Sequence, residues 1–61
     1  MELRAVGSDK VVGTVEFEDG VLTLAGAAGD AFAALRRHLG DQRLGEDLVA
    51  NGWSNGYLYL A

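Results

Sequence analysis

The chain has 61 residues, a length that fits one domain and leaves no room for a second. It contains no cysteine and one histidine, which excludes a disulfide and a zinc site built from this chain alone. The formal net charge is −4, with five basic residues against nine acidic ones, which argues against a general nucleic-acid binder. A core of this size typically supplies no more than about 3–5 kcal/mol. We therefore expect tight packing, or burial against another protein.

The N-terminal residues contain no basic segment followed by an apolar run, so we expect no signal peptide. No stretch approaches about 18 consecutive apolar residues, so we expect no membrane span and a cytoplasmic location. The composition has one lysine, no isoleucine and many alanine, glycine, valine and leucine residues, a bias typical of high-GC genomes. Size and bias together suit an accessory protein of a phage or mobile element of a high-GC bacterium. For a phage-derived protein, the virion is the alternative to the cytoplasm.

The first 25 residues predict a three-stranded antiparallel meander with one apolar and one polar face. Apolar and polar residues alternate over 1–6 and again over 11–18, and residues 7–10 have turn composition. Asp19-Gly20 then separates 11–18 from a third strand at 21–25. This dipeptide indicates a hairpin, because a type I′ turn needs positive φ at both central residues.

The apolar pattern also predicts the register of both hairpins. A two-residue loop at Asp19-Gly20 pairs Glu18 with Val21, Phe17 with Leu22, Glu16 with Thr23 and Val15 with Leu24. A slip of one residue would place both leucines against the glutamates. A first loop centred on Asp9 would pair Leu3 with Val15, Ala5 with Gly13 and Met1 with Phe17.

Two short helices are expected after the meander. Residues 26–29 break the third strand, and Asp30 can cap a helix or lie in its first turn. Phe32, Leu35 and Leu39 share one face of this helix. Gly40 is a good terminator of it.

The second helix is expected to begin after a cap at Asp41 and to end at Asn51-Gly52. It carries Leu44 and Leu48 at i and i+4, and Arg43 can pair with Asp47 on its exposed side. Gly45 weakens this helix by about 1 kcal/mol relative to alanine.

Residues 53–56 read as a turn and 57–60 as a short closing strand, in which the two leucines share one face and the two tyrosines the other. The predicted fold is thus a single α+β domain over residues 1–61, in the order β-β-β-α-α-β. It has a small three- to four-stranded antiparallel sheet with two short helices packed on one face. The sequence leaves open which edge of the meander the last strand joins.

No catalytic constellation is present, so we expect neither an enzyme nor a cofactor. His38 lies at a predicted helix end beside two arginines, where the helix dipole favours a cation. Glu16 and Glu18 lie on the open face of a strand rather than in a cleft that would perturb their pKa values. The glycine-rich residues 26–30 lack the lysine and hydroxyl of a phosphate-binding loop.

Two groups of side chains remain as candidates for binding. Arg36, Arg37 and Arg43 form a small basic cluster that could hold a phosphate or an acidic partner, although the helix dipole accounts for the first two. Three of the five aromatic residues fall within one stretch of seven residues near the C-terminal end, namely Trp53, Tyr57 and Tyr59.

Tryptophan and tyrosine are enriched in interface hot spots. If the leucines of the closing strand face the core, both tyrosines face outward. The alternative is that Trp53 completes the core and the tyrosines stabilise the sheet through cross-strand pairs.

The leading hypothesis is a non-catalytic interaction or structural module that binds itself or another protein through Trp53, Tyr57 and Tyr59 and an open sheet edge. The alternative is a binder of nucleic acid or an anionic ligand through the arginine cluster.

Overall fold

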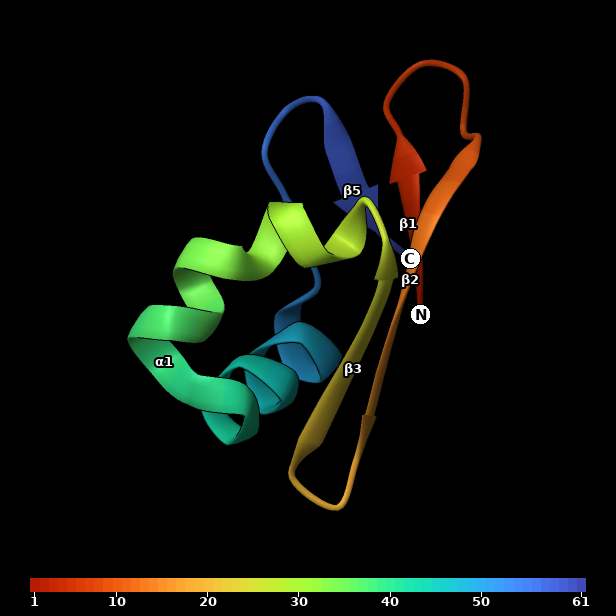
Figure 1. Ribbon diagram of the computed structural model, residues 1–61. Coiled ribbons are helices and arrows are strands. Elements are labelled where there is room, and N and C mark those ends of the chain that lie inside the picture. The colour runs from red at the N-terminus through yellow and green to blue at the C-terminus, as the bar shows by residue number, and fades with distance from the viewer.

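The computed structural model describes residues 1–61 and has an α+β fold, with one helix packed on one face of a five-stranded antiparallel sheet (Figure 1). The elements are β1 (Glu2–Ala5), β2 (Val11–Glu18), β3 (Val21–Gly26), α1 (Ala28–Asn51), β4 (Trp53–Ser54) and β5 (Leu58–Leu60). The strand order across the sheet is β3-β2-β1-β5-β4. The predicted α+β class is confirmed, whereas the predicted numbers of strands and helices are wrong.

The β2–β3 hairpin has the predicted register. Its paired residues are Glu18 with Val21, Phe17 with Leu22, Glu16 with Thr23 and Val15 with Leu24. Asp19 and Gly20 have φ values of 52° and 78°, the positive values that a type I′ turn requires. Turn chemistry and apolar alternation therefore agree here.

The predicted register of β1 against β2 is wrong by two residues. Leu3 lies opposite Gly13 rather than Val15, and the ladder contains an irregularity between Leu3 and Arg4. The loop is centred earlier than predicted, and its residues Gly7 and Asp9 both have positive φ. A shift of two residues keeps every side chain on its own face, so the apolar pattern could not distinguish the two registers.

The closing segment supplies two strands where the sequence predicted one. β5 joins the meander on the β1 side, with Leu3 opposite Leu60, and β4 pairs with β5 outside it. Residues 53–54 were predicted as part of a turn. They form β4 because the Asn55 side chain accepts hydrogen bonds from the N–H groups of Tyr57 and Leu58, which turns the chain back on itself.

The two predicted helices are one helix, α1, with a kink at Gly40. Gly40 has φ 79° and ψ 167°, so the helical path breaks at the predicted residue, but helical turns resume without an intervening loop. Asp30 lies in the first turn of α1, one of the two positions predicted for it. The predicted Arg43–Asp47 pair does not form, and the Asp47 carboxylate accepts a hydrogen bond from the Asn51 side chain at 2.8 Å.

The core lies between α1 and the sheet and draws on every part of the chain except the turns. Its fully buried apolar residues are Leu3, Val15, Leu22, Ala28, Phe32, Leu44 and Leu48. Leu35, Leu39, Leu58 and Leu60 pack around this cluster, as the periodicity of the sequence predicted. α1 does not contain a segment long and apolar enough to cross a bilayer.

Candidate interaction surfaces

The three C-terminal aromatic residues occupy three different environments. Trp53 packs on the core, with its ring edge-to-face against Phe32 at a centroid distance of 4.7 Å. Tyr59 is half-buried, and it lies on the other face of the sheet from Leu58 and Leu60. Tyr57 is 81% exposed. The structure therefore separates the predicted aromatic group, and only Tyr57 presents its ring fully to solvent.

Tyr59 connects the last strand to the first turn of the chain. Its hydroxyl donates a hydrogen bond to the Asp9 carboxylate at 2.5 Å. This bond, together with partial burial, raises the pKa of Tyr59 above its ordinary value. The contact joins residues 50 positions apart and holds the loop between β1 and β2 against β5.

The exposed ring of Tyr57 has an apolar neighbour across the chain. The N–H of Val6 donates to the main-chain carbonyl of Tyr57 at 2.8 Å, and the Val6 side chain is 53% exposed. These residues belong to the two turns that lie side by side at one end of the sheet (Figure 1). We call Val6 and Tyr57 together the turn surface.

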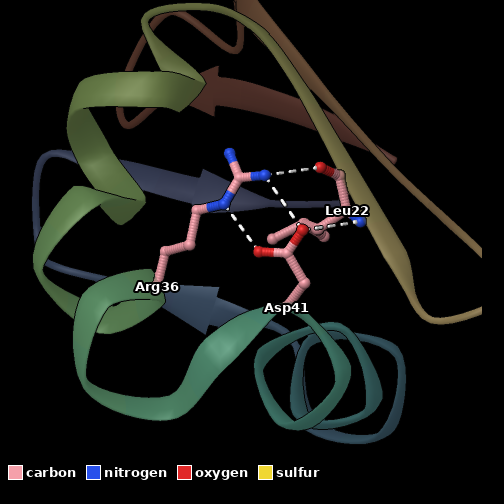
Figure 2. Close-up of polar contacts among 3 residues, drawn as sticks. All are labelled: Leu22, Arg36 and Asp41. Carbon is pink, nitrogen blue, oxygen red and sulfur yellow. Dashed lines mark hydrogen bonds and ion pairs between the residues drawn. The ribbon is translucent and has the colours of Figure 1, made fainter.

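The arginine cluster is also divided. Arg36 folds back onto β3, where its guanidinium donates to both carboxylate oxygens of Asp41 and to the main-chain carbonyl of Leu22 (Figure 2). The distances are 2.6 Å from Nε to Oδ1, 2.9 Å from Nη2 to Oδ2, and 3.1 Å from Nη2 to the carbonyl oxygen. Asp41 Oδ2 in turn accepts the N–H of Leu22 at 3.3 Å.

Arg36 and Asp41 together, which we call the edge clamp, bond both outward main-chain groups of Leu22. At this position of the free β3 edge, the two side chains thus make the main-chain hydrogen bonds that a neighbouring strand would otherwise make. The hydrogen bonds from Arg36, and then the bond from the Leu22 N–H, lower the pKa of the Asp41 carboxyl despite partial burial. The hydrogen bond to Asp41 also raises the pKa of Arg36.

The sequence did not reveal this use of Asp41, which was predicted to cap a helix. No motif signals it, because the partner is a main-chain group 19 residues away. Arg36 is therefore engaged within the molecule. Arg37 and Arg43 form no ion pair, and the hollow beside Arg43 also contains Glu46 and Asp47. Anion binding by the cluster stays a prediction for these two residues.

The structure does not bring together the remaining titratable residues that the sequence offered as candidates for a site. His38 lies exposed on α1, and Glu16 and Glu18 lie exposed on the face of the sheet that α1 does not cover. Comparison of the chain with protein families, with curated proteins and with solved structures found no match.

Proposed function

We propose that this chain is a small non-catalytic protein–protein interaction module that docks on a second protein molecule through the turn surface. The observation that carries the proposal is the exposure of Tyr57. The other four aromatic side chains are buried or half-buried, whereas Tyr57 is 81% exposed. Tyrosine is among the residues that dominate binding energy in interfaces, because it buries a large area and keeps a polar tip.

The backbone at Tyr57 is already ordered in the free chain. Its N–H donates to the Asn55 side chain at 2.9 Å, and its carbonyl accepts the N–H of Val6 at 2.8 Å. A residue that is held in place before binding loses less conformational entropy when a partner covers it. This supports Tyr57 as a contact residue rather than a mobile surface side chain.

The proposed role needs no catalytic group. The support for this part is that His38 forms no hydrogen bond or ion pair, and that the hydroxyl of Tyr59 is engaged with Asp9. A marginal core of this size also gains stability when a partner buries part of its surface.

The test compares Tyr57→Ser with Val21→Ser, a control that removes another exposed apolar side chain, 59% exposed, from β3. Sedimentation equilibrium of each variant measures self-association, and co-purification from the native host measures binding to other proteins. We expect Tyr57→Ser to lose the complex that the parent chain and Val21→Ser both retain. If Tyr57→Ser keeps every complex of the parent chain, or if the parent chain forms none, the proposal is wrong.

A further inference from the structure

The chain contains two asparagine–glycine pairs, Asn51-Gly52 and Asn55-Gly56, which the structure holds in different ways. At such a pair the main-chain nitrogen of glycine can attack the side-chain carbonyl carbon of asparagine, because glycine has no side chain to hinder the approach. The attack expels ammonia and closes a cyclic imide. Whether a pair reacts depends on how its glycine N–H is bonded, where its amide points, and what stabilises the negative charge that develops on the amide oxygen.

The structure holds Asn51-Gly52 in an unreactive arrangement at the end of α1. The Asn51 amide is turned back along the helix, where its Nδ2 donates to the Asp47 carboxylate at 2.8 Å. The Gly52 N–H donates to the main-chain carbonyl of Leu48 at 2.9 Å. The nitrogen that would attack is therefore engaged, and the amide that it would attack is held against the preceding helical turn.

Asn55-Gly56 lies in the exposed turn between β4 and β5, and its amide points along the chain in the other direction. Oδ1 of Asn55 accepts the N–H of Tyr57 at 2.9 Å and the N–H of Leu58 at 2.8 Å. The bond from Tyr57 closes a ring of atoms that contains both Cγ of Asn55 and the nitrogen of Gly56, as in an Asx turn. The carbon and the nitrogen that would join are thus kept together in one compact ring.

The nitrogen of Gly56 is also more available than that of Gly52. Its N–H donates only to the Ser54 hydroxyl, at 3.3 Å, and Ser54 is exposed, so this side chain can rotate away. Gly56 is itself exposed, and nothing lies within 4 Å of the place that a Cβ atom would take. Base from the solvent can therefore reach this N–H and remove its proton.

The two N–H groups that bond Oδ1 of Asn55 are placed where negative charge develops during the attack. As the Gly56 nitrogen adds to Cγ, this carbon becomes tetrahedral and its oxygen becomes an oxyanion. A hydrogen bond to a charged oxygen is roughly twice as strong as one to a neutral carbonyl. Both bonds therefore strengthen on the way to the transition state, which lowers the barrier.

We propose that Asn55 is a site of self-modification, at which the folded chain converts its own asparagine through a cyclic imide to aspartate or isoaspartate. The bond from Cγ to the Gly56 nitrogen forms and the bond from Cγ to Nδ2 breaks. The proton lost by Gly56 passes through solvent to the departing ammonia. Water then adds its hydroxyl to one of the two imide carbons and its proton to the nitrogen. Attack at Cγ gives aspartate, and attack at the main-chain carbon gives isoaspartate.

The two products differ in their effect on the turn. Aspartate keeps a side-chain oxygen that can accept the N–H groups of Tyr57 and Leu58, and its charge strengthens these bonds. Isoaspartate diverts the main chain through Cβ and Cγ, which lengthens it by one methylene and removes Oδ1 as a side-chain acceptor. Isoaspartate would therefore free the backbone that holds Tyr57. The chemistry at Asn55 does not depend on the proposed function of the turn surface.

The test incubates the full chain at neutral and mildly alkaline pH, both folded and in guanidinium chloride, and follows each asparagine by peptide mass spectrometry. Folding should slow the reaction of Asn51 about tenfold or more, since the end of the helix must open first. Asn55 should react at least as fast in the folded chain as in denaturant, and faster at the higher pH because Gly56 must lose its proton. Isoaspartate at position 55 identifies the imide route, because direct hydrolysis of the amide gives only aspartate.

A matched pair of variants assigns the reaction to one asparagine. Asn55→Asp and Asn51→Asp each remove one exposed amide and add the same charge. Asn55→Asp should abolish most of the ammonia that the folded chain releases, whereas Asn51→Asp should leave it unchanged. Amide exchange at Tyr57 and Leu58 should stay slow in Asn55→Asp and become fast in the purified isoaspartate form.

Several results would overturn the inference. They are a slower reaction of Asn55 in the folded chain than in denaturant, an earlier reaction of Asn51 than of Asn55 in the folded chain, and aspartate as the sole product. Equal protection of the Tyr57 N–H in the isoaspartate form and in Asn55→Asp would also contradict it.

Discussion

Gly45 on α1 lies directly against the ring of Phe17 on β2, so closely that a Cβ atom at position 45 would overlap the ring. Glycine in a helix interior costs about 1 kcal/mol relative to alanine. The structure gives the reason for accepting that cost, because the absence of a side chain lets the helix approach the sheet and cover Phe17.

We expect Gly45→Ala to lower the free energy of unfolding by about 1–2 kcal/mol, because overpacking outweighs the gain in helix propensity. Urea unfolding measures this change. Gly29→Ala is the matched control, since nothing lies within 4 Å of a Cβ atom there and its φ is not positive. It should leave stability unchanged or raise it by up to about 1 kcal/mol. Equal stability of Gly45→Ala and the parent chain would contradict the contact.

Gly13 makes a close approach of a different kind, to main-chain atoms rather than to a ring. A Cβ atom at Gly13 would lie 2.8 Å from the carbonyl oxygen of Ala25 and 2.9 Å from the main-chain nitrogen of Ala28. Both neighbours are backbone, so neither can move away as a side chain could. We expect Gly13→Ala to cost about 3 kcal/mol or more, measured by thermal unfolding. Thr14→Ala, at the next and exposed position, should change stability much less; a similar loss in both variants would argue against the close packing.

The edge clamp predicts a dependence of stability on acid pH. Arg36 and the Leu22 N–H lower the pKa of Asp41 below its ordinary value of 3.8 in the folded state. The stabilisation is therefore complete above that ordinary value and is lost as the pH falls through the lower pKa of the folded chain. We expect Asp41→Asn to lower the urea midpoint at neutral pH and to remove part of the decline seen in the parent chain below pH 3.8.

Glu18→Gln is the control for this series, because Glu18 is an exposed carboxylate that forms no ion pair. It should keep the acid decline that is due to Asp41. Loss of the clamp also exposes the main-chain groups of Leu22, so Asp41→Asn should aggregate more readily than Glu18→Gln. If the two variants have the same pH profile, the edge clamp does not contribute to stability.

The Tyr59–Asp9 contact predicts that the stability of the folded chain depends on pH in the alkaline range. The pKa of Tyr59 is raised above its ordinary value of 10.0, chiefly by the hydrogen bond to Asp9. Its stabilisation is complete below pH 10.0 and is lost as the pH rises through the higher pKa of the folded chain. Tyr59→Phe should therefore be less stable than the parent chain at neutral pH and should decline less above pH 10.0.

Amide hydrogen exchange provides a second measurement for Tyr59→Phe. The hydroxyl holds the loop between β1 and β2, so its removal should speed exchange of the Asp9 N–H, which is bonded to the carbonyl of Ala5 at 2.9 Å. The amides of β3, at the far edge of the sheet, should exchange as in the parent chain. Unchanged protection of Asp9 would mean that the hydrogen bond does not order the loop.

Several features of this molecule could be predicted from the amino-acid sequence alone, because they depend on neighbouring residues. The β2–β3 hairpin follows from Asp19-Gly20 and from the alternation on both sides of it. The break at Gly40 and the inward faces of α1 follow from glycine and from apolar residues at helical spacing. The outward position of Tyr57 and Tyr59 follows from the alternation of the last strand once Leu58 and Leu60 face the core.

Other features were decided only when distant parts of the chain met. Every residue carries the same main-chain groups, so the residue pattern could not predict that Arg36 and Asp41 bond those of Leu22. For the same reason it could not predict that the main-chain groups of Phe17 form no bond with β3. A two-residue shift of β1 preserves its apolar face, so its register needed the loop geometry. The edge of the meander that β5 joins, and hence the outer edge of β3 that stays free, is a property of the assembled sheet.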